Sequence, residues 1–153
     1  MSKSNAFETD LLTLLFNNTN IANIGDATGL RGSSTAGSFY IALHSADPGE
    51  AGATQTTSEA TYGSYARQAV ARASGAGGWA VSGNSVGNVT AITFPAGSSG
   101  TVAQNALYAS VGTIVSGAGY ILYRALISGG GLYTGTGITP VLNATTGFVV
   151  TED

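Results

Sequence analysis

His44 is the only histidine of this 153-residue chain, and Ser45 and Asp47 follow it closely. A serine nucleophile, a histidine base and an orienting carboxylate form a hydrolytic site only where the three side chains converge. Neighbouring side chains on an extended strand point to opposite faces, so His44 and Ser45 cannot meet directly. We therefore interpret His44 as a half-buried residue at a strand end, bonded to the adjacent turn. We expect no catalytic residue.

The remaining residues contain no sequence motif for a metal-binding or phosphate-binding site. The carboxylates match no calcium-binding loop and single out no pair of the kind a glycosidase needs. Asp47 and Glu50 could still share a cation with loop carbonyls, which stays open as an alternative. Neither GxxxxGK nor GxGxxG occurs, and cysteine is absent, which removes disulfides and thiolate sites. We expect no metal-binding residue, no cofactor-binding residue and no cofactor.

Aromatic residues leave one binding alternative open. Seven tyrosines and Trp79 could form a platform on which sugars stack, because aromatic rings offer broad apolar faces. At the spacing of β-strands, however, we expect most of these rings to lie in the core or in an interface.

Charge is scarce and unevenly distributed. Only 8% of residues are charged, and between Arg72 and Glu152 the one charged side chain is Arg124. No basic cluster and no window of about 18 apolar residues occurs, so we expect neither a nucleic-acid partner nor a membrane. Small uncharged side chains lose little entropy on burial, which favours a surface that neighbours cover. A β-protein with a neutral free surface is the alternative.

The elements that position these residues begin with a helix, predicted over residues 4–17. Ser4 or Asn5 can cap its start, and Glu8 stands three residues after Asn5, as in a capping box. The following Asn/Thr-rich stretch ends the helix near Phe16. Apolar residues at helical spacing predict one buried stripe, which consists of Phe7, Leu11, Leu14 and Leu15.

Short apolar runs separated by turn residues follow from residue 38 onward, which is typical of β-strands. We predict a mainly β fold of about eight short strands, an antiparallel β-sandwich or partly open barrel over residues 38–153 with the helix in front. The chain is expected to form a single domain over residues 1–153. The strands are expected near residues 39–44, 65–73, 79–81, 84–94, 106–115, 119–127, 137–141 and 147–151.

Several of these segments resemble a family of small virion proteins of tailed bacteriophages, often labelled tail fibre proteins. The resemblance is close over residues 4–94, looser over about 97–146, and returns at the C-terminus. It implies a virion component and supplies no catalytic residue. The segments that carry it are Ser4–Leu12, Leu43–Gly52, Tyr65–Arg72, Trp79-Ala80-Val81-Ser82-Gly83-Asn84 and the final Thr151-Glu152-Asp153.

Two structural roles follow from the resemblance. A fibre usually needs a repetitive or coiled-coil shaft, which this sequence lacks, so we rank a capsid decoration or cement protein on the head lattice first. A tail or tail-fibre-associated protein, which could act as a host-glycan-binding adhesin, is the alternative. The expected partners are the major capsid protein or tail proteins, and we expect a homo-oligomer or a lattice-bound protein. We expect a non-enzymatic protein of the virion, assembled in the cytoplasm of the bacterial host.

Overall fold

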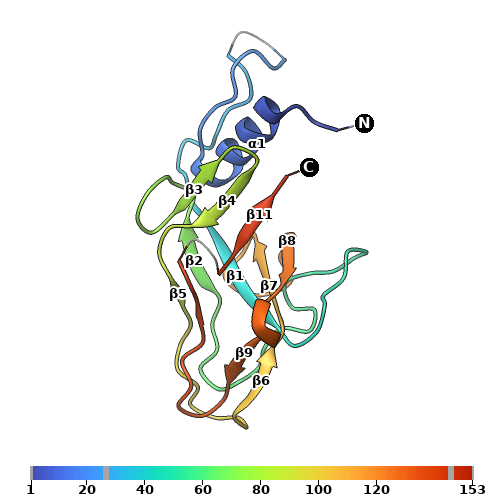
Figure 1. Cartoon of the computed structure of the whole chain (residues 1–153), viewed down its shortest axis with the longest axis vertical. Helices are drawn as coiled ribbons and strands as arrows, with labels where there is room; N and C mark the ends of the chain where they lie inside the picture. Colours follow the sequence, from blue (N-terminus) through green and yellow to red (C-terminus); the bar gives the residue numbers. More distant parts are fainter. Residues whose placement is uncertain (1, 26–27, 145–146, 153) are drawn as a thin grey trace. The chain divides into compact units, whose positions relative to one another are not determined.

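The computed structural model describes residues 2–25, 28–144 and 147–152, so Asp153 of the C-terminal motif lies outside the described residues. These residues form one α-helix and eleven strands in four small antiparallel sheets, none of which closes into a barrel (Figure 1). The predicted mainly β fold with a leading helix is confirmed, and it is consistent with a sandwich. No described helix has the length and apolar character needed to cross a bilayer. The elements are α1 (Asn5–Asn17), β1 (Ser38–His44), β2 (Gln68–Ala71), β3 (Trp79–Ser82), β4 (Ser85–Asn88), β5 (Ile92–Thr93), β6 (Ala103–Ala106), β7 (Tyr108–Gly112), β8 (Ile121–Leu126), η1 (Ser128–Gly130), β9 (Leu132–Thr134), β10 (Val141–Leu142) and β11 (Val149–Thr151).

The chain passes back and forth between two compact units. The first unit comprises Met1–Ser38, Val70–Ala91 and Asn143–Asp153, and the second unit comprises Phe39–Ala69 and Ile92–Leu142. A single domain over residues 1–153 stays a prediction.

The helix of the first unit begins and ends as its sequence indicates. The backbone N–H of Phe7 donates to Ser4 Oγ at 3.4 Å, so Ser4 is the N-cap. Asn18 closes the last turn in the left-handed region, at φ 56°, and its N–H donates to the Thr13 carbonyl. The predicted start and end of the helix are therefore correct to within a residue.

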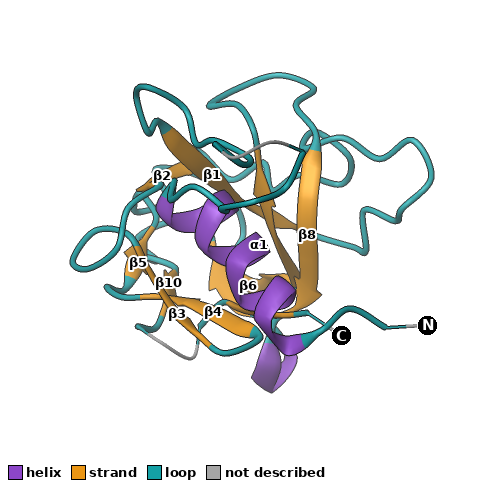
Figure 2. Cartoon of the chain, turned by 90° about the horizontal axis from the view of Figure 1, so that it is seen from above, coloured by secondary structure: helices purple, strands orange, loops and turns teal. Residues whose placement is uncertain are grey.

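The predicted buried stripe of α1 is wrong. The buried residues are Glu8, Leu12 and Phe16, whereas Phe7 is 37% exposed. At about 100° per residue, the apolar side chains of this helix span roughly 200° of its circumference, which is wider than one contact requires. Periodicity alone cannot predict which residues within so wide an arc are buried. Packing against β3 and β4 makes the choice (Figure 2).

Trp79 is the centre of the core in the first unit. Its ring is completely buried and meets Phe16 edge-on, with centroids 4.7 Å apart, and Phe148 at 6.5 Å. Trp79 stands at the start of β3, which pairs with β4, and β4 pairs in turn with β11. The helix and the C-terminal strand are thus held by one aromatic cluster.

The second unit contains β7, β8 and all of β1 except Ser38, and these strands belong to the largest sheet, which has the order β2-β1-β7-β8. In its centre β1 pairs with β7, so that Leu43 faces Ala109 and His44 faces Tyr108. The predicted strand at 106–115 corresponds to β7, whereas β6, which overlaps it only at Ala106, and β9 were not predicted. Three residues after a run of glycines offer no alternation from which β9 could be recognised.

Candidate interaction surface of the second unit

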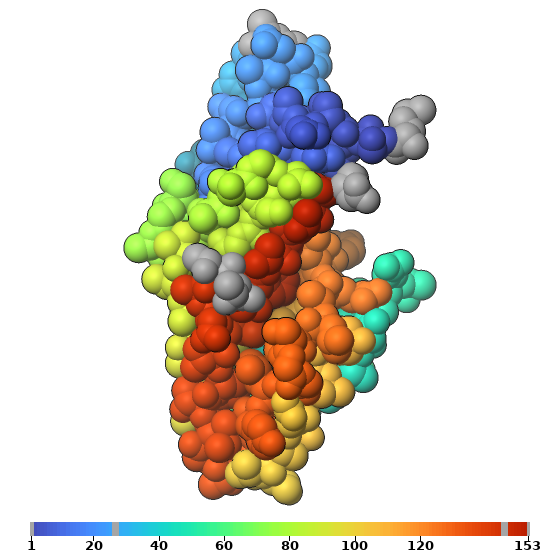
Figure 3. Space-filling view, viewed as in Figure 1, coloured from blue at the N-terminus to red at the C-terminus, as the bar shows by residue number. Residues whose placement is uncertain are grey.

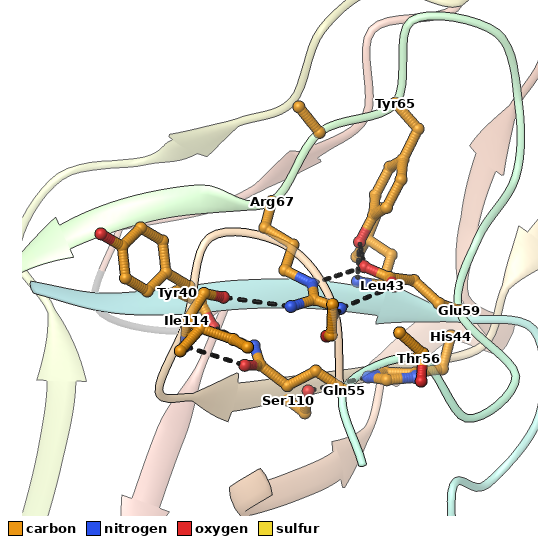
Figure 4. A network of polar contacts seen from close by, with 12 residues as sticks. Tyr40, Leu43, His44, Gln55, Thr56, Glu59, Tyr65, Arg67, Ser110 and Ile114 are labelled. Carbon is orange, nitrogen blue, oxygen red and sulfur yellow. Dashed lines mark hydrogen bonds and ion pairs between the residues drawn. The ribbon is translucent and has the colours of Figure 1, made fainter. Parts of the chain in front are cut away.

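His44 lies at the end of β1 and is completely buried rather than half-buried. Its Nδ1 lies 2.8 Å from the Thr57 carbonyl oxygen. Its Nε2 lies 2.7 Å from Ser110 Oγ (Figure 4). Burial lowers the pKa of His44 below the usual 6.5, so the ring is neutral at pH 7. A carbonyl only accepts, so Nδ1–H donates to Thr57 and Nε2 accepts from the Ser110 hydroxyl. The bond to Thr57, not one to the adjacent turn, holds the ring.

The residues around His44 in the sequence do not converge on it. Ser45 Oγ donates to the Ser58 carbonyl at 3.2 Å, and Asp47 pairs with Arg124. The hydroxyl beside His44 belongs to Ser110 on β7, which the sequence did not indicate. Ser110 and His44 are both completely buried, so this serine and histidine join β1 to β7 out of reach of a substrate. That no residue is catalytic stays a prediction.

A buried ion pair lies close to this contact. Arg67 Nε is 2.7 Å from Glu59 Oε1 and its NH2 is 2.8 Å from Oε2, while its side chain is only 3% exposed. Tyr65 donates its hydroxyl to Glu59 Oε1 at 3.1 Å and accepts from the Leu43 backbone N–H. Burial holds the pKa of Tyr65 well above its usual 10, so this phenol remains a donor at neutral pH.

Arg67 and Gln55 fix the loop that joins β7 to β8. Arg67 donates to the carbonyls of Ile114 at 3.0 Å and Gly117 at 2.8 Å. The completely buried Gln55 accepts from the Ile114 N–H at 3.1 Å, and its backbone N–H donates to the Gly119 carbonyl. Two buried polar side chains therefore set the course of this loop from inside the unit.

The β7–β8 hairpin presents apolar side chains outward. Of the ten large hydrophobic residues that are exposed in the described chain, five belong to the short segment 114–126, with exposed fractions between 39% and 77%. Single exposed apolar residues are ordinary, but their concentration on one hairpin is not. We call these five residues the hairpin surface: Ile114, Val115, Tyr120, Leu122 and Leu126.

Arg124 is the only charged residue on β8, and its charge is compensated within the unit. Its guanidinium lies 2.9 Å from Asp47 Oδ1 and 3.3 Å from Glu50 Oε1, and its Nε donates to the Gly49 carbonyl. The cation that Asp47 and Glu50 share is thus Arg124. No described group of three or more His, Cys, Asp or Glu residues could hold a metal ion. Figure 3 shows this part of β8, in orange, at the surface beside the turquoise segment around residue 50.

Two open hollows adjoin the hairpin surface. One, of about 520 Å³, is lined by Val115 together with Glu59, Tyr65 and Arg67. The other, of about 430 Å³, lies beside Leu122 and extends to Glu50. Exposed apolar side chains of the hairpin surface therefore form part of the walls of both hollows.

Trp79 cannot take part in the sugar-stacking platform that was left open for Trp79 and the seven tyrosines. Trp79 is completely buried between other rings, so no sugar can stack on it. Among the tyrosines, Tyr120 and Tyr133 are the strongly exposed ones, at 77% and 56%. A stacking surface centred on Trp79 does not exist in the folded unit.

One comparison with known proteins gives a match. A family model described as podophage GP4 fiber I protein gp80 matches residues 2–139. The match runs from α1 to beyond β9 and contains every residue of the hairpin surface. It also covers most of the region, about 97–146, where the resemblance seen in the sequence was looser. No curated protein and no solved structure matches the chain.

Proposed function

Because the chain belongs to the family of podophage GP4 fiber I protein gp80, we propose that it is a non-enzymatic structural component of a phage fibre. The resemblance to tailed-phage virion proteins is confirmed by this membership. The match over residues 2–139 is the observation that carries the proposal.

The fibre role is the one that our sequence-based ranking placed second. Capsid decoration ranked first because the sequence has no repetitive or coiled-coil shaft. In the structure, α1 is the one α-helix of the described residues and is only 13 residues long. The name of the family favours the fibre instead. A chain without a shaft can form a compact part of a fibre whose length other chains supply, so the missing shaft does not oppose this role.

The hairpin surface supports a role within an assembly. Five exposed apolar side chains stand on a loop and strand that buried polar groups hold in place. A contact made by such a surface orders few groups on binding, which lowers the entropic cost of association. Fibre or tail proteins of the same virion are the partners we propose, and the virion is the proposed location.

Electron microscopy of virions labelled with a gold-conjugated antibody against this chain tests the proposal. We expect gold on fibres at the tail. Gold spread over the head lattice would support capsid decoration instead, and particles without gold, despite expression in the infected host, would refute a virion role.

A further inference from the structure

We propose that the hairpin surface is where two copies of this chain bind each other. The inference rests on the proposed function, in which the chain is part of an assembly, and it names the partner of one surface. Three features of the second unit carry it: the placement of exposed apolar residues, the pairing of its charges, and the hollows that exposed apolar side chains line.

Exposed apolar residues gather in the second unit. Seven of the ten exposed large hydrophobic residues of the described chain belong to it, and five of these form the hairpin surface. Tyr120 is the most exposed of all, at 77%. Aromatic residues surrounded by apolar neighbours are the usual energetic centres of protein interfaces. Tyr120 is therefore the expected anchor of the contact.

Every charged side chain of the second unit is already paired within the unit. Its five charged residues form two groups, Arg67 with Glu59, and Arg124 with Asp47 and Glu50. A foreign partner is normally selected by complementary free charges, and this unit offers none. When two copies meet across a two-fold axis, an unpaired charge near the axis lies opposite the same charge of the other copy and is repelled by it. A surface whose charges are all compensated avoids that repulsion.

The shape of the patch also suits a contact between identical surfaces. A symmetric contact requires projections and hollows on the same surface, because each copy supplies both. Here the exposed Val115 and Leu122 each line a hollow, of about 520 and 430 Å³ respectively, so the same surface offers apolar side chains and space that a copy could fill. Gln55 and Arg67 hold the loop in this form without a partner.

Addition of a partner strand to the edge of β8 is the competing arrangement. β8 is the last strand of its sheet, but Thr54 forms an isolated bridge with Tyr120, and Arg124 Nε donates to the Gly49 carbonyl. Residues of the same chain thus lie along this edge and protect it, as native proteins commonly do. Contact through side chains is therefore the arrangement we propose.

Sedimentation equilibrium of the full-length protein over a range of concentrations tests the inference. The wild type is expected to self-associate, and the Tyr120→Ser/Leu126→Ser variant is expected to have a dissociation constant at least about tenfold higher. Leu30→Ser/Val149→Ser is the matched control, because it removes two exposed apolar side chains from the first unit. The control should associate as the wild type does. Circular dichroism should show the same fold in all three proteins.

Raising the salt concentration should leave the dissociation constant nearly unchanged, because the charges of the surface are paired before contact. A wild type that stays monomeric up to its solubility limit would overturn the inference, as would equal dissociation constants for the wild type and the hairpin variant. These results are independent of the gold labelling. A monomer found on fibres would refute only the contact between copies, whereas an oligomer absent from virions would refute only the virion role.

Discussion

Replacing Arg67 with methionine would remove the guanidinium that joins three parts of the second unit. In the folded protein this group makes two hydrogen bonds to the Glu59 carboxylate, at 2.7 and 2.8 Å, and two to the carbonyls of Ile114 and Gly117. Methionine has a similar apolar stem but no donor. The variant therefore tests the polar contacts while much of the side-chain packing is kept.

The expected loss of stability follows from burial. Removing one partner of a buried ion pair typically costs about 3–5 kcal/mol, because the other charge stays desolvated. The Glu59 side chain is 17% exposed and can regain some water, so the lower end, about 3 kcal/mol, applies here. The free energy of unfolding of an ordinary domain is about 5–15 kcal/mol, so the expected loss is a large share of the total.

Equilibrium unfolding in urea measures this loss. With a slope of about 1–3 kcal/mol per molar urea, the midpoint should fall by roughly 1–3 M. Amide hydrogen exchange at residues 114–119 should accelerate at the same time, because their carbonyl anchors are gone. In the double variant Glu59→Gln/Arg67→Met the loss should be clearly smaller than the sum of the two single losses.

Arg124→Met is the matched control for this prediction. Arg124 also pairs with two carboxylates, but its side chain is 25% exposed and its partners are more exposed still. Exposed ion pairs contribute about 0–1 kcal/mol. If Arg67→Met cost no more than about 1 kcal/mol, like this control, the claim that the Glu59–Arg67 pair and its loop contacts hold the unit together would be refuted.

Three further predictions concern the same unit. Because burial lowers the folded-state pKa of His44 below 6.5, the unfolded chain binds a proton more readily than the folded protein, so the free energy of unfolding should fall as the pH drops below about 6.5. The urea midpoint, measured from pH 7.5 to 5.5, should show this dependence. An equally steep dependence in a His44→Gln variant would contradict the prediction. Because burial raises the folded-state pKa of Tyr65 above 10, stability should fall as the pH rises beyond 10, and Tyr65→Phe should reduce that fall in alkaline thermal melts; an unchanged alkaline profile would contradict it. A Cβ at Gly112 would overlap the buried Gln55 side chain. Gly112→Ala should therefore lower the free energy of unfolding, measured in urea, by about 1–3 kcal/mol. A variant as stable as the wild type would show that Gln55 can move aside.

Local features of the structure could be predicted well. Ser4 caps α1 because a serine before an amphipathic run supplies the missing acceptor for the first turn. β1 was expected at 39–44 and extends by one residue, to Ser38. The mainly β class followed from turn residues between short apolar runs. Each of these signals depends on residues within a few positions of one another.

The residues of the interaction surface could be predicted only in part. The lone charge at Arg124 and the small polar residues around it indicated a surface to be covered. Its compensation by Asp47 was not visible, because 77 positions separate the two residues. Ser110 meets His44 across 66 positions for the same reason. Such pairs depend on the register of β1, β7 and β8, which no local pattern specifies.

Composition and periodicity are properties of the amino-acid chain alone, and here they specify a charge-poor, mainly β protein with a capped N-terminal helix. The folded chain selects which part of the wide apolar arc of α1 is buried and places Trp79 in the core. It also brings Gln55 and Arg67 to the loop of the hairpin surface, which they hold in place. These outcomes depend on which distant side chains share a packed interior. Packing is a property of three-dimensional neighbours and has no fixed spacing along the chain.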